Sequence, residues 1–176
     1  MGRPKASLVV RGRTLLERAL DAAAHHPTVV VVGSLPTSAQ ELLEERARTS
    51  DVRVIVNDAP ELGMSRSLAL ADAAVPDRSR ALAVLLLDTP FVDARILARV
   101  AAARGESDVA YPVRDGVQGH PVIFGPRARE FIAALAAGDT LRRLRDDSRL
   151  RRVRVALEDD APFVDVDTPE DFTALA

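Results

Sequence analysis

The sequence contains no cysteine and few aromatic residues. Without cysteine, the chain can form neither a disulfide framework nor a catalytic or metal-binding thiolate. Only 3% of the residues are aromatic, so alanine, valine and leucine must fill the core. The net charge of −2 gives no bulk attraction to nucleic acid or to an anionic membrane. No apolar run reaches the length of a membrane span or of a signal peptide, so we expect a cytoplasmic globular domain with neither nucleic-acid nor membrane partners.

Lysine is nearly absent as well. Lys5 is the only lysine, and every other strongly basic residue is an arginine. It lies beside Arg3 in a loop that Gly2 and Pro4 keep free of regular structure. A compact ammonium on a flexible stem can approach phosphate oxygens as a point charge, which a planar guanidinium does differently. Lys5 is therefore either a phosphate-binding residue or a lysine retained by chance.

Apolar runs that predict strands alternate with periodic segments that predict helices. The 176 residues are enough for one domain with a substantial core. Asp115-Gly116 predicts a hairpin turn late in the chain. The alternation therefore predicts a mostly parallel, three-layer α/β sheet with at least one late antiparallel strand. Strands are expected at 28–32, 52–56, 81–87, 109–113, 122–124 and 163–167.

Paired side chains predict capping boxes at three helix N-termini. The pairs are Thr14 with Glu17, Ser38 with Glu41, and Thr168 with Asp171. The arginine-rich segment 142–154 is interrupted by aspartates, so it predicts a solvated face rather than a nucleic-acid patch.

The longest apolar run, Ala81–Leu87, ends in Asp88-Thr89-Pro90. A run of this length that stops abruptly predicts a strand buried on both faces. In an open α/β sheet, ligands bind just beyond the carboxyl ends of the strands, where Asp88 would lie. Asp88 is therefore either a cap of the following turn or helix, or a residue that contacts metal or substrate.

A second acidic feature lies near the C-terminus, where Val164 and Val166 alternate with Asp165 and Asp167. On a strand, this alternation places both carboxylates on one face. Two like charges so placed repel each other unless a cation or an arginine lies between them. A metal site is therefore plausible here, alongside a purely structural reading.

Three further residues have both a structural and a functional interpretation. Ser65 and Ser67 can be ordinary caps, or they can present hydroxyl and backbone N–H groups to an anion at a helix N-terminus. His120, in Gly119-His120-Pro121, is more often a structural than a catalytic histidine.

Five segments, in order, resemble the sequence blocks of the MobA-like nucleotidyltransferases. The first resembles the tail of that family's signature loop, Leu-Ala-Ala-Gly-x-Ser-x-Arg-Met-Gly-x-x-Lys. The pattern is closest to that of molybdenum cofactor cytidylyltransferases, and the match runs nearly from end to end. The segments are Met1-Gly2-Arg3-Pro4-Lys5-Ala6, Gly63-Met64-Ser65-Arg66-Ser67-Leu68, Leu87-Asp88-Thr89-Pro90, Gly119-His120-Pro121-Val122 and Asp165-Val166-Asp167-Thr168-Pro169-Glu170-Asp171.

The resemblance implies a Rossmann-like, GT-A-like nucleotidyltransferase fold and a Mg²⁺-dependent reaction. A CMP or GMP group would pass from CTP or GTP to a phosphorylated, molybdopterin-type small molecule, with release of pyrophosphate. A molybdoenzyme or a chaperone is a further possible partner. Attack of one phosphate on another brings anions together, so charge neutralisation and positioning dominate such catalysis.

The resemblance also implies roles for individual residues. Lys5 and Asp88 would be catalytic, and Mg²⁺ would bind Asp88 and Asp167, with Asp165 as the alternative second carboxylate. The triphosphate and nucleotide would bind Arg3, Lys5 and Asn57, and the acceptor would bind Ser65, Ser67, Gly119 and His120.

The chain departs from the family pattern at its start, which falls inside the signature loop. We expect one domain over residues 1–176 that lacks the family's first strand and glycine-rich turn. We expect either that the coding sequence continues upstream of Met1 or that the chain is a shortened paralogue. Without that first strand, the strands on either side of its place in the sheet would expose unpaired backbone groups and apolar side chains. The choice between CTP and GTP stays open, as do two alternative functions: a non-catalytic nucleotide- or partner-binding paralogue, and a sugar-phosphate nucleotidyltransferase.

Overall fold

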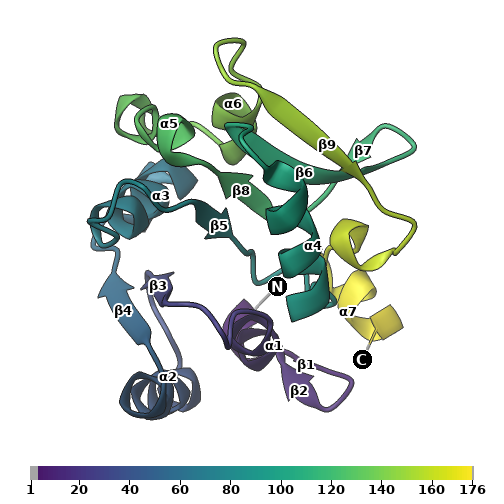
Figure 1. Ribbon diagram of the computed structural model, residues 1–176. Coiled ribbons are helices and arrows are strands. Elements are labelled where there is room, and N and C mark those ends of the chain that lie inside the picture. The colour runs from purple at the N-terminus through teal and green to yellow at the C-terminus, as the bar shows by residue number, and fades with distance from the viewer. Residues whose placement is uncertain (1–3, 176) are drawn as a thin grey trace.

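A computed structural model describes residues 4–175 as an α/β fold in which strands and helices alternate (Figure 1). The strands are β1 (Val9–Val10), β2 (Arg13–Thr14), β3 (Thr28–Val32), β4 (Val52–Val56), β5 (Leu82–Val84), β6 (Val109–Arg114), β7 (Val117–Gln118), β8 (Val122–Phe124) and β9 (Arg152–Ala156). The α-helices are α1 (Leu15–Ala22), α2 (Thr37–Thr49), α3 (Met64–Ala73), α4 (Ala94–Arg104), α5 (Pro126–Arg129), α6 (Leu141–Arg145) and α7 (Pro169–Leu175). Short 3-10 helices are η1 (Lys5–Ser7), η2 (Pro60–Leu62), η3 (Ile132–Ala134) and η4 (Ala161–Phe163).

The larger sheet has five strands, β5 to β9. Strand β8 lies between β5 and β6 and is antiparallel to both, while β9 pairs parallel with β6. Strands β5, β6 and β9 therefore run in one direction, and the late strand β8 runs against them, as the sequence predicts. The β6–β7 hairpin turns at Asp115 and Gly116, both with positive φ, which confirms the predicted turn.

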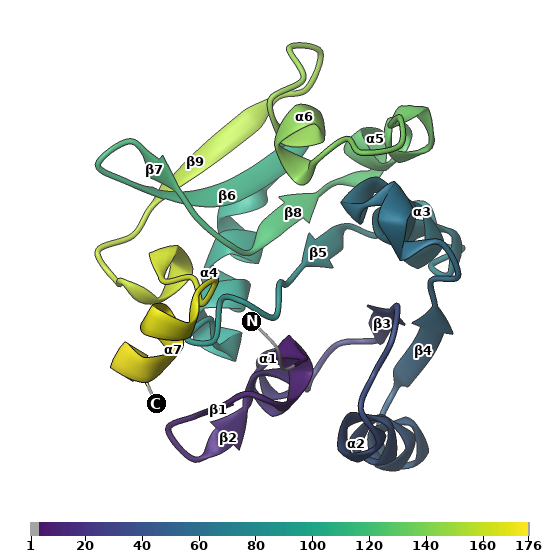
Figure 2. The same ribbon diagram turned by 180° about the vertical axis from the view of Figure 1, so that it is seen from behind.

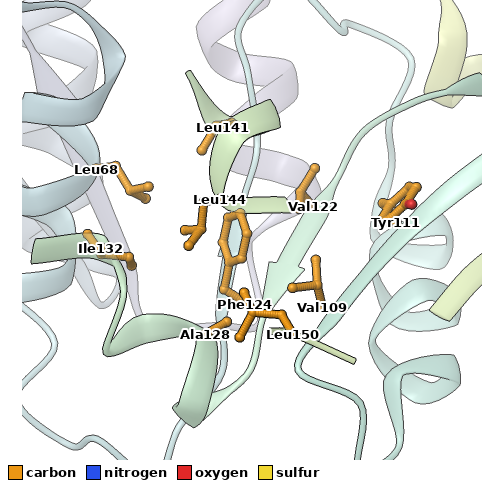
Figure 3. Close-up of a cluster of buried hydrophobic side chains, with 10 residues drawn as sticks. All are labelled: Leu68, Val109, Tyr111, Val122, Phe124, Ala128, Ile132, Leu141, Leu144 and Leu150. Atoms are coloured by element: carbon orange, nitrogen blue, oxygen red, sulfur yellow. The ribbon is translucent and has the colours of Figure 1, made fainter. Parts of the chain in front are cut away.

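Helices cover both faces of this sheet (Figures 1 and 2). On one face, α4 buries Ile96, Leu97 and Val100 against side chains of β6, β8 and β9. On the other face, helices α3, α5, η3 and α6 pack on β6 and β8. Figure 3 shows this second cluster, which consists of Leu68, Val109, Tyr111, Val122, Phe124, Ala128, Ile132, Leu141, Leu144 and Leu150. The predicted three-layer architecture is therefore confirmed.

Strands β1 and β2 form a short antiparallel sheet of their own. The smaller parallel sheet consists of β3 and β4, with α2 packed against it. Both strands have the predicted bounds, but neither is buried. Every residue of Thr28–Val32 is half-buried, and three of the five residues of β4 are exposed. Helix α2 covers one face of the pair only in part, and Val56 keeps 66% of its surface exposed.

The apolar run Ala81–Leu87 is not a strand buried on both faces, so that prediction is wrong. Only Leu82–Val84 forms a strand, with two half-buried residues and one exposed. The reason is pairing: among the described residues, β5 has a strand partner only in β8, and β3 has one only in β4. Among the described residues, β3 and β5 therefore each have one edge without a strand partner.

Three other predictions are corrected. Phe163–Asp167 is not a strand, because η4 ends at Phe163 and residues 164–167 pair with no strand. Strand β9 begins within segment 142–154, where the arginine-rich composition concealed it. Helix α2 begins after Pro36 with no side-chain cap, so the expected Ser38–Glu41 box is absent.

The other two capping boxes are confirmed, at α1 by Thr14 with Glu17 and at α7 by Thr168 with Asp171. Between residues 4 and 175, the structure has no helix that combines the length and the apolarity needed to cross a bilayer.

Candidate functional site

Lys5 brings together the two carboxylates that the sequence predicts as metal ligands. Its Nζ lies 3.3 Å from Asp88 Oδ2 and 2.7 Å from Asp167 Oδ1. The three residues are separated by up to 162 positions along the chain. The side chains of Lys5 and Asp88 are 34% and 28% exposed, whereas Asp167 is 65% exposed. The site is therefore a shallow one, open to solvent on the Asp167 side.

The backbone around Val166 holds the two acidic segments together. Val166 N donates a hydrogen bond of 2.8 Å to Asp88 O, and the Val166 side chain is fully buried. Asp165 and Asp167, on either side of Val166, are exposed. The capping carboxylate of Asp171 accepts from Asp167 N at 3.1 Å, which ties the site to the start of α7. Val166 is therefore buried between two exposed aspartates, although the segment is not the predicted strand.

Gly119 and His120 contact η4, immediately before the same segment. His120 N donates to Pro162 O at 2.9 Å. A Cβ on Gly119 would lie 2.2 Å from Pro162 O and 2.8 Å from the Phe163 ring. No side chain fits there, so glycine is needed for close packing against η4, just before the acidic pair. The structure thus assigns Gly119 a structural role, and its predicted contact with the acceptor stays a prediction.

Opposing charges shift two pKa values at the site. Burial disfavours the charged Lys5 ammonium, but the hydrogen bond to Asp167 and the charges of Asp88 and Asp167 outweigh burial and raise the pKa of Lys5. Burial, and then the charges of Asp88 and Asp167, raise the pKa of Asp165 above its usual value. The charges of Asp88 and Asp167 contribute to both shifts.

The donor set fits a hard divalent cation. Asp88 Oδ1 is buried and has no hydrogen-bond partner among the described residues, and a buried carboxylate oxygen of this kind needs one. In residues 4–175, no group of three or more histidine, cysteine or acidic side chains is arranged to hold a metal ion. Mg²⁺ commonly binds through one or two carboxylates and completes its shell with water and substrate phosphates. Asp88 and Asp167 match that mode of binding.

His120 lies close enough to Asp88 for the two to interact electrostatically. Burial lowers the pKa of His120; Asp88 opposes this effect, and Arg145 reinforces it. Its Nδ1 is buried without a partner in the described part of the chain. His120 is therefore a neutral imidazole with one ring nitrogen available, next to the acidic site.

Most of the other predicted binding residues already have partners. Asn57 is buried; its amide nitrogen donates to Ser67 Oγ at 3.0 Å, and its amide oxygen accepts from Ala59 N at 3.1 Å. Ser65 is buried, and its hydroxyl makes a long bond of 3.4 Å to Leu62 O. These contacts hold the turn before α3, so the binding roles of all three residues stay predictions. Arg3 lies outside the described residues.

Arg145 is a buried charge near the site that sequence reasoning missed. It is 7% exposed, and its guanidinium stacks 5.1 Å from the centre of the Tyr111 ring. The reading of 142–154 as a solvated face is therefore wrong for this residue. The spacing contained a signal, because Arg145 is four residues after the buried Leu141 on the same helix face.

Comparisons with known proteins agree with these features. The model of the MobA-like NTP transferase domain matches residues 1–156. A molybdenum cofactor guanylyltransferase of Xanthomonas euvesicatoria pv. vesicatoria (strain 85-10) is 32% identical over 181 aligned positions, which cover 99% of this chain and 87% of that protein.

Solved structures give the same result. The homologue of Mycobacterium tuberculosis Rv0371c from Mycobacterium sp. strain JC1 is 26% identical, with a TM-score of 0.79 and coverage of 99% of this chain and 87% of that one. Rv0371c of Mycobacterium tuberculosis in complex with manganese is also 26% identical, with a TM-score of 0.76 and coverage of 99% and 92%.

These comparisons confirm the family expected from the five motifs. They differ from the motif pattern in one respect, because the curated relative is a guanylyltransferase, whereas the pattern is closest to cytidylyltransferases. The family model and the 32% identical relative both cover most of the chain. The chain therefore belongs to the MobA-like NTP transferase family and is a nucleotidyltransferase.

Proposed function

We propose that this protein transfers GMP from GTP to a phosphorylated, molybdopterin-type acceptor in a Mg²⁺-dependent reaction. The observation that carries the proposal is the convergence of Lys5, Asp88 and Asp167, with Asp88 Oδ1 left unpaired. The name of the Xanthomonas relative supports guanylyl transfer, and the manganese complex of Rv0371c supports a divalent ion. CMP transfer from CTP is the alternative that the motif pattern favours.

The reaction joins two anions, so the protein must reduce their repulsion. An acceptor phosphate oxygen attacks the α-phosphorus of the NTP; a new P–O bond forms, and the bond to the leaving pyrophosphate breaks. Lys5 contributes a positive charge on a mobile stem that can reach the triphosphate. Asp88 and Asp167 would hold Mg²⁺, which neutralises phosphate charge when bound.

The acceptor would bind on the side of His120 and the first turn of α3. A neutral His120 adds no charge there and offers one ring nitrogen for a hydrogen bond. Ser65 and Ser67 lie in the first turn of α3, after Gly63, although their hydroxyls have partners within the chain. We therefore propose that acceptor binding exchanges those partners for phosphate oxygens.

The test is a transfer assay with purified protein and Mg²⁺. Equal concentrations of GTP and CTP are offered with a molybdopterin-type acceptor, and the dinucleotide product and pyrophosphate are measured. We expect turnover with GTP above that with CTP. Turnover with CTP but not GTP would show that the protein is a cytidylyltransferase instead. Turnover only with a sugar phosphate would show that the acceptor is not of the molybdopterin type. Nucleotide binding without turnover on any acceptor would contradict the proposal in favour of the non-catalytic alternative.

A further inference from the structure

One ammonium group serves two carboxylates at the proposed metal site. Lys5 Nζ is within hydrogen-bonding distance of Asp88 Oδ2 and of Asp167 Oδ1, at 3.3 and 2.7 Å. Asp165, two residues before Asp167, is a third acidic side chain close enough to interact with both carboxylates and with Lys5. The position between the two carboxylates is thus occupied by a positive charge, the ammonium group of Lys5.

We propose that Lys5 and a divalent ion are alternative occupants of this position. The inference rests on the proposed function only in taking a divalent ion as the ligand. Without metal, Lys5 holds Asp88 and Asp167 together; when metal and NTP bind, Lys5 leaves the carboxylates and pairs with the phosphates.

Limited space and like-charge repulsion both favour replacement of the Lys5 ammonium by the metal ion over binding of the two together. Mg²⁺ binds oxygen at about 2.0–2.1 Å, so an ion held by both carboxylates would need the space that the ammonium group fills. An ammonium left beside that ion would meet strong like-charge repulsion. Lys5 can move, because its four-carbon side chain is flexible and is 34% exposed.

Exchange couples the metal to the nucleotide. Metal alone must displace Lys5 and leave its charge without a partner, so it binds weakly. The triphosphate gives Lys5 a new partner, so it strengthens metal binding, and metal strengthens nucleotide binding by the same factor. Free Mg²⁺ then binds the site poorly in the absence of substrate.

The absence of any second lysine permits a direct test on the unaltered protein. Labelling with ¹³C at the lysine ε-carbon gives a side-chain NMR signal that belongs to Lys5 alone. We expect Mg²⁺ with a non-hydrolysable GTP analogue to shift this signal away from its metal-free position. An unchanged signal at saturating Mg²⁺ and nucleotide would overturn the proposal.

A second test measures metal affinity without nucleotide. In Lys5→Met, which keeps the aliphatic stem and removes the charge, we expect Mn²⁺ to bind at least about fivefold more tightly than to the parent chain. Lys5→Arg keeps the charge and should remain weak. The control is Arg80→Met, which removes a charge from the exposed ion pair with Asp77 and should leave affinity unchanged. Equal or weaker binding to Lys5→Met, or no binding to either chain, would overturn the exchange.

These outcomes are separable from those of the proposed function. Tighter Mn²⁺ binding in Lys5→Met without transfer activity in the parent chain would refute the reaction and leave the exchange intact. Transfer activity combined with unchanged Mn²⁺ affinity would refute the exchange and leave the reaction intact.

Discussion

The five-stranded sheet and the β3–β4 sheet contain similar residues that differ in burial. Val122 in the five-stranded sheet is 1% exposed, whereas Val56 in the two-stranded sheet is 66% exposed. Both are valines in short strands. Val122 lies under helices, in a strand between two paired strands, whereas β3 and β4 each have a strand neighbour on one edge only among the described residues. The apolar composition of a strand therefore indicates which side chains can be buried. Pairing with other strands and packing of helices determine which of them are buried.

The burial of ion pairs differs between the two regions in the same way. Arg129, on the larger sheet's side, is completely buried; it pairs with Asp72 at 2.6 Å and donates to the carbonyls of Asp72, Val75, Asp77 and Arg80. Arg46, on α2, pairs with Asp21 at 3.0 Å, and both side chains are about a third exposed at 29% and 32%. Burial should make the first pair far more sensitive to mutation than the second.

The largest expected effect comes from Arg129. We expect Arg129→Met to lower the free energy of unfolding by about 3–5 kcal/mol, because it leaves Asp72 and several carbonyls buried with fewer donors. Arg46→Met, the matched change in the smaller sheet's region, should cost about 0–1 kcal/mol. Urea denaturation followed by circular dichroism measures both. Equal losses would mean that the two regions do not differ as described.

A valine pair tests the apolar side of the comparison. Val122→Ala should cost about 2 kcal/mol through lost burial and an unfilled cavity. Val56→Ala should change stability by no more than about 0.5 kcal/mol. The same urea titrations apply. A large loss at Val56 would show that β4 is covered in solution, which would remove the contrast.

The smallest effect concerns pH. Burial lowers the pKa of His120, an effect that Asp88 opposes and Arg145 reinforces, so folded His120 stays neutral where the unfolded chain takes up a proton. The neutral folded His120 therefore costs no stability above about pH 6.5. Below that pH, protonation of the unfolded chain lowers the free energy of unfolding. His120→Gln should therefore flatten the decline in stability from pH 7 to 5, whereas the exposed His26→Gln should not. Identical profiles for both variants would argue against a neutral buried His120.

Local patterns predicted local structure well. The strands 28–32, 52–56 and 122–124 have the predicted bounds, and the predicted capping boxes at Thr14 and Thr168 are present. These features depend on alternation, turn residues and caps that act over a few positions. Strand β9 was missed although Arg-Val-Arg-Val alternates, because the arginines suggested a solvated segment.

Features that depend on distant neighbours could not be predicted locally. The half-buried state of Leu82–Val84 follows from which strands lie beside it, and the need for glycine at position 119 follows from Pro162 and Phe163. The pairing of Asp88 with Asp167 came from the family resemblance, since no local pattern links residues so far apart. The bridge through Lys5 became visible only in three dimensions.

The central claim is that Asp88 is a functional carboxylate and not a helix or turn cap. Its side chain accepts from Lys5, and its Oδ1 has no partner within residues 4–175, so the turn at Thr89 does not require its charge. The most direct measurement is the Mg²⁺-dependent transfer rate of Asp88→Asn, with its urea midpoint as a check on folding. We predict a loss of at least about a hundredfold in rate with a nearly unchanged midpoint. An unchanged rate in a folded variant would contradict the account and leave Asp88 as a structural residue.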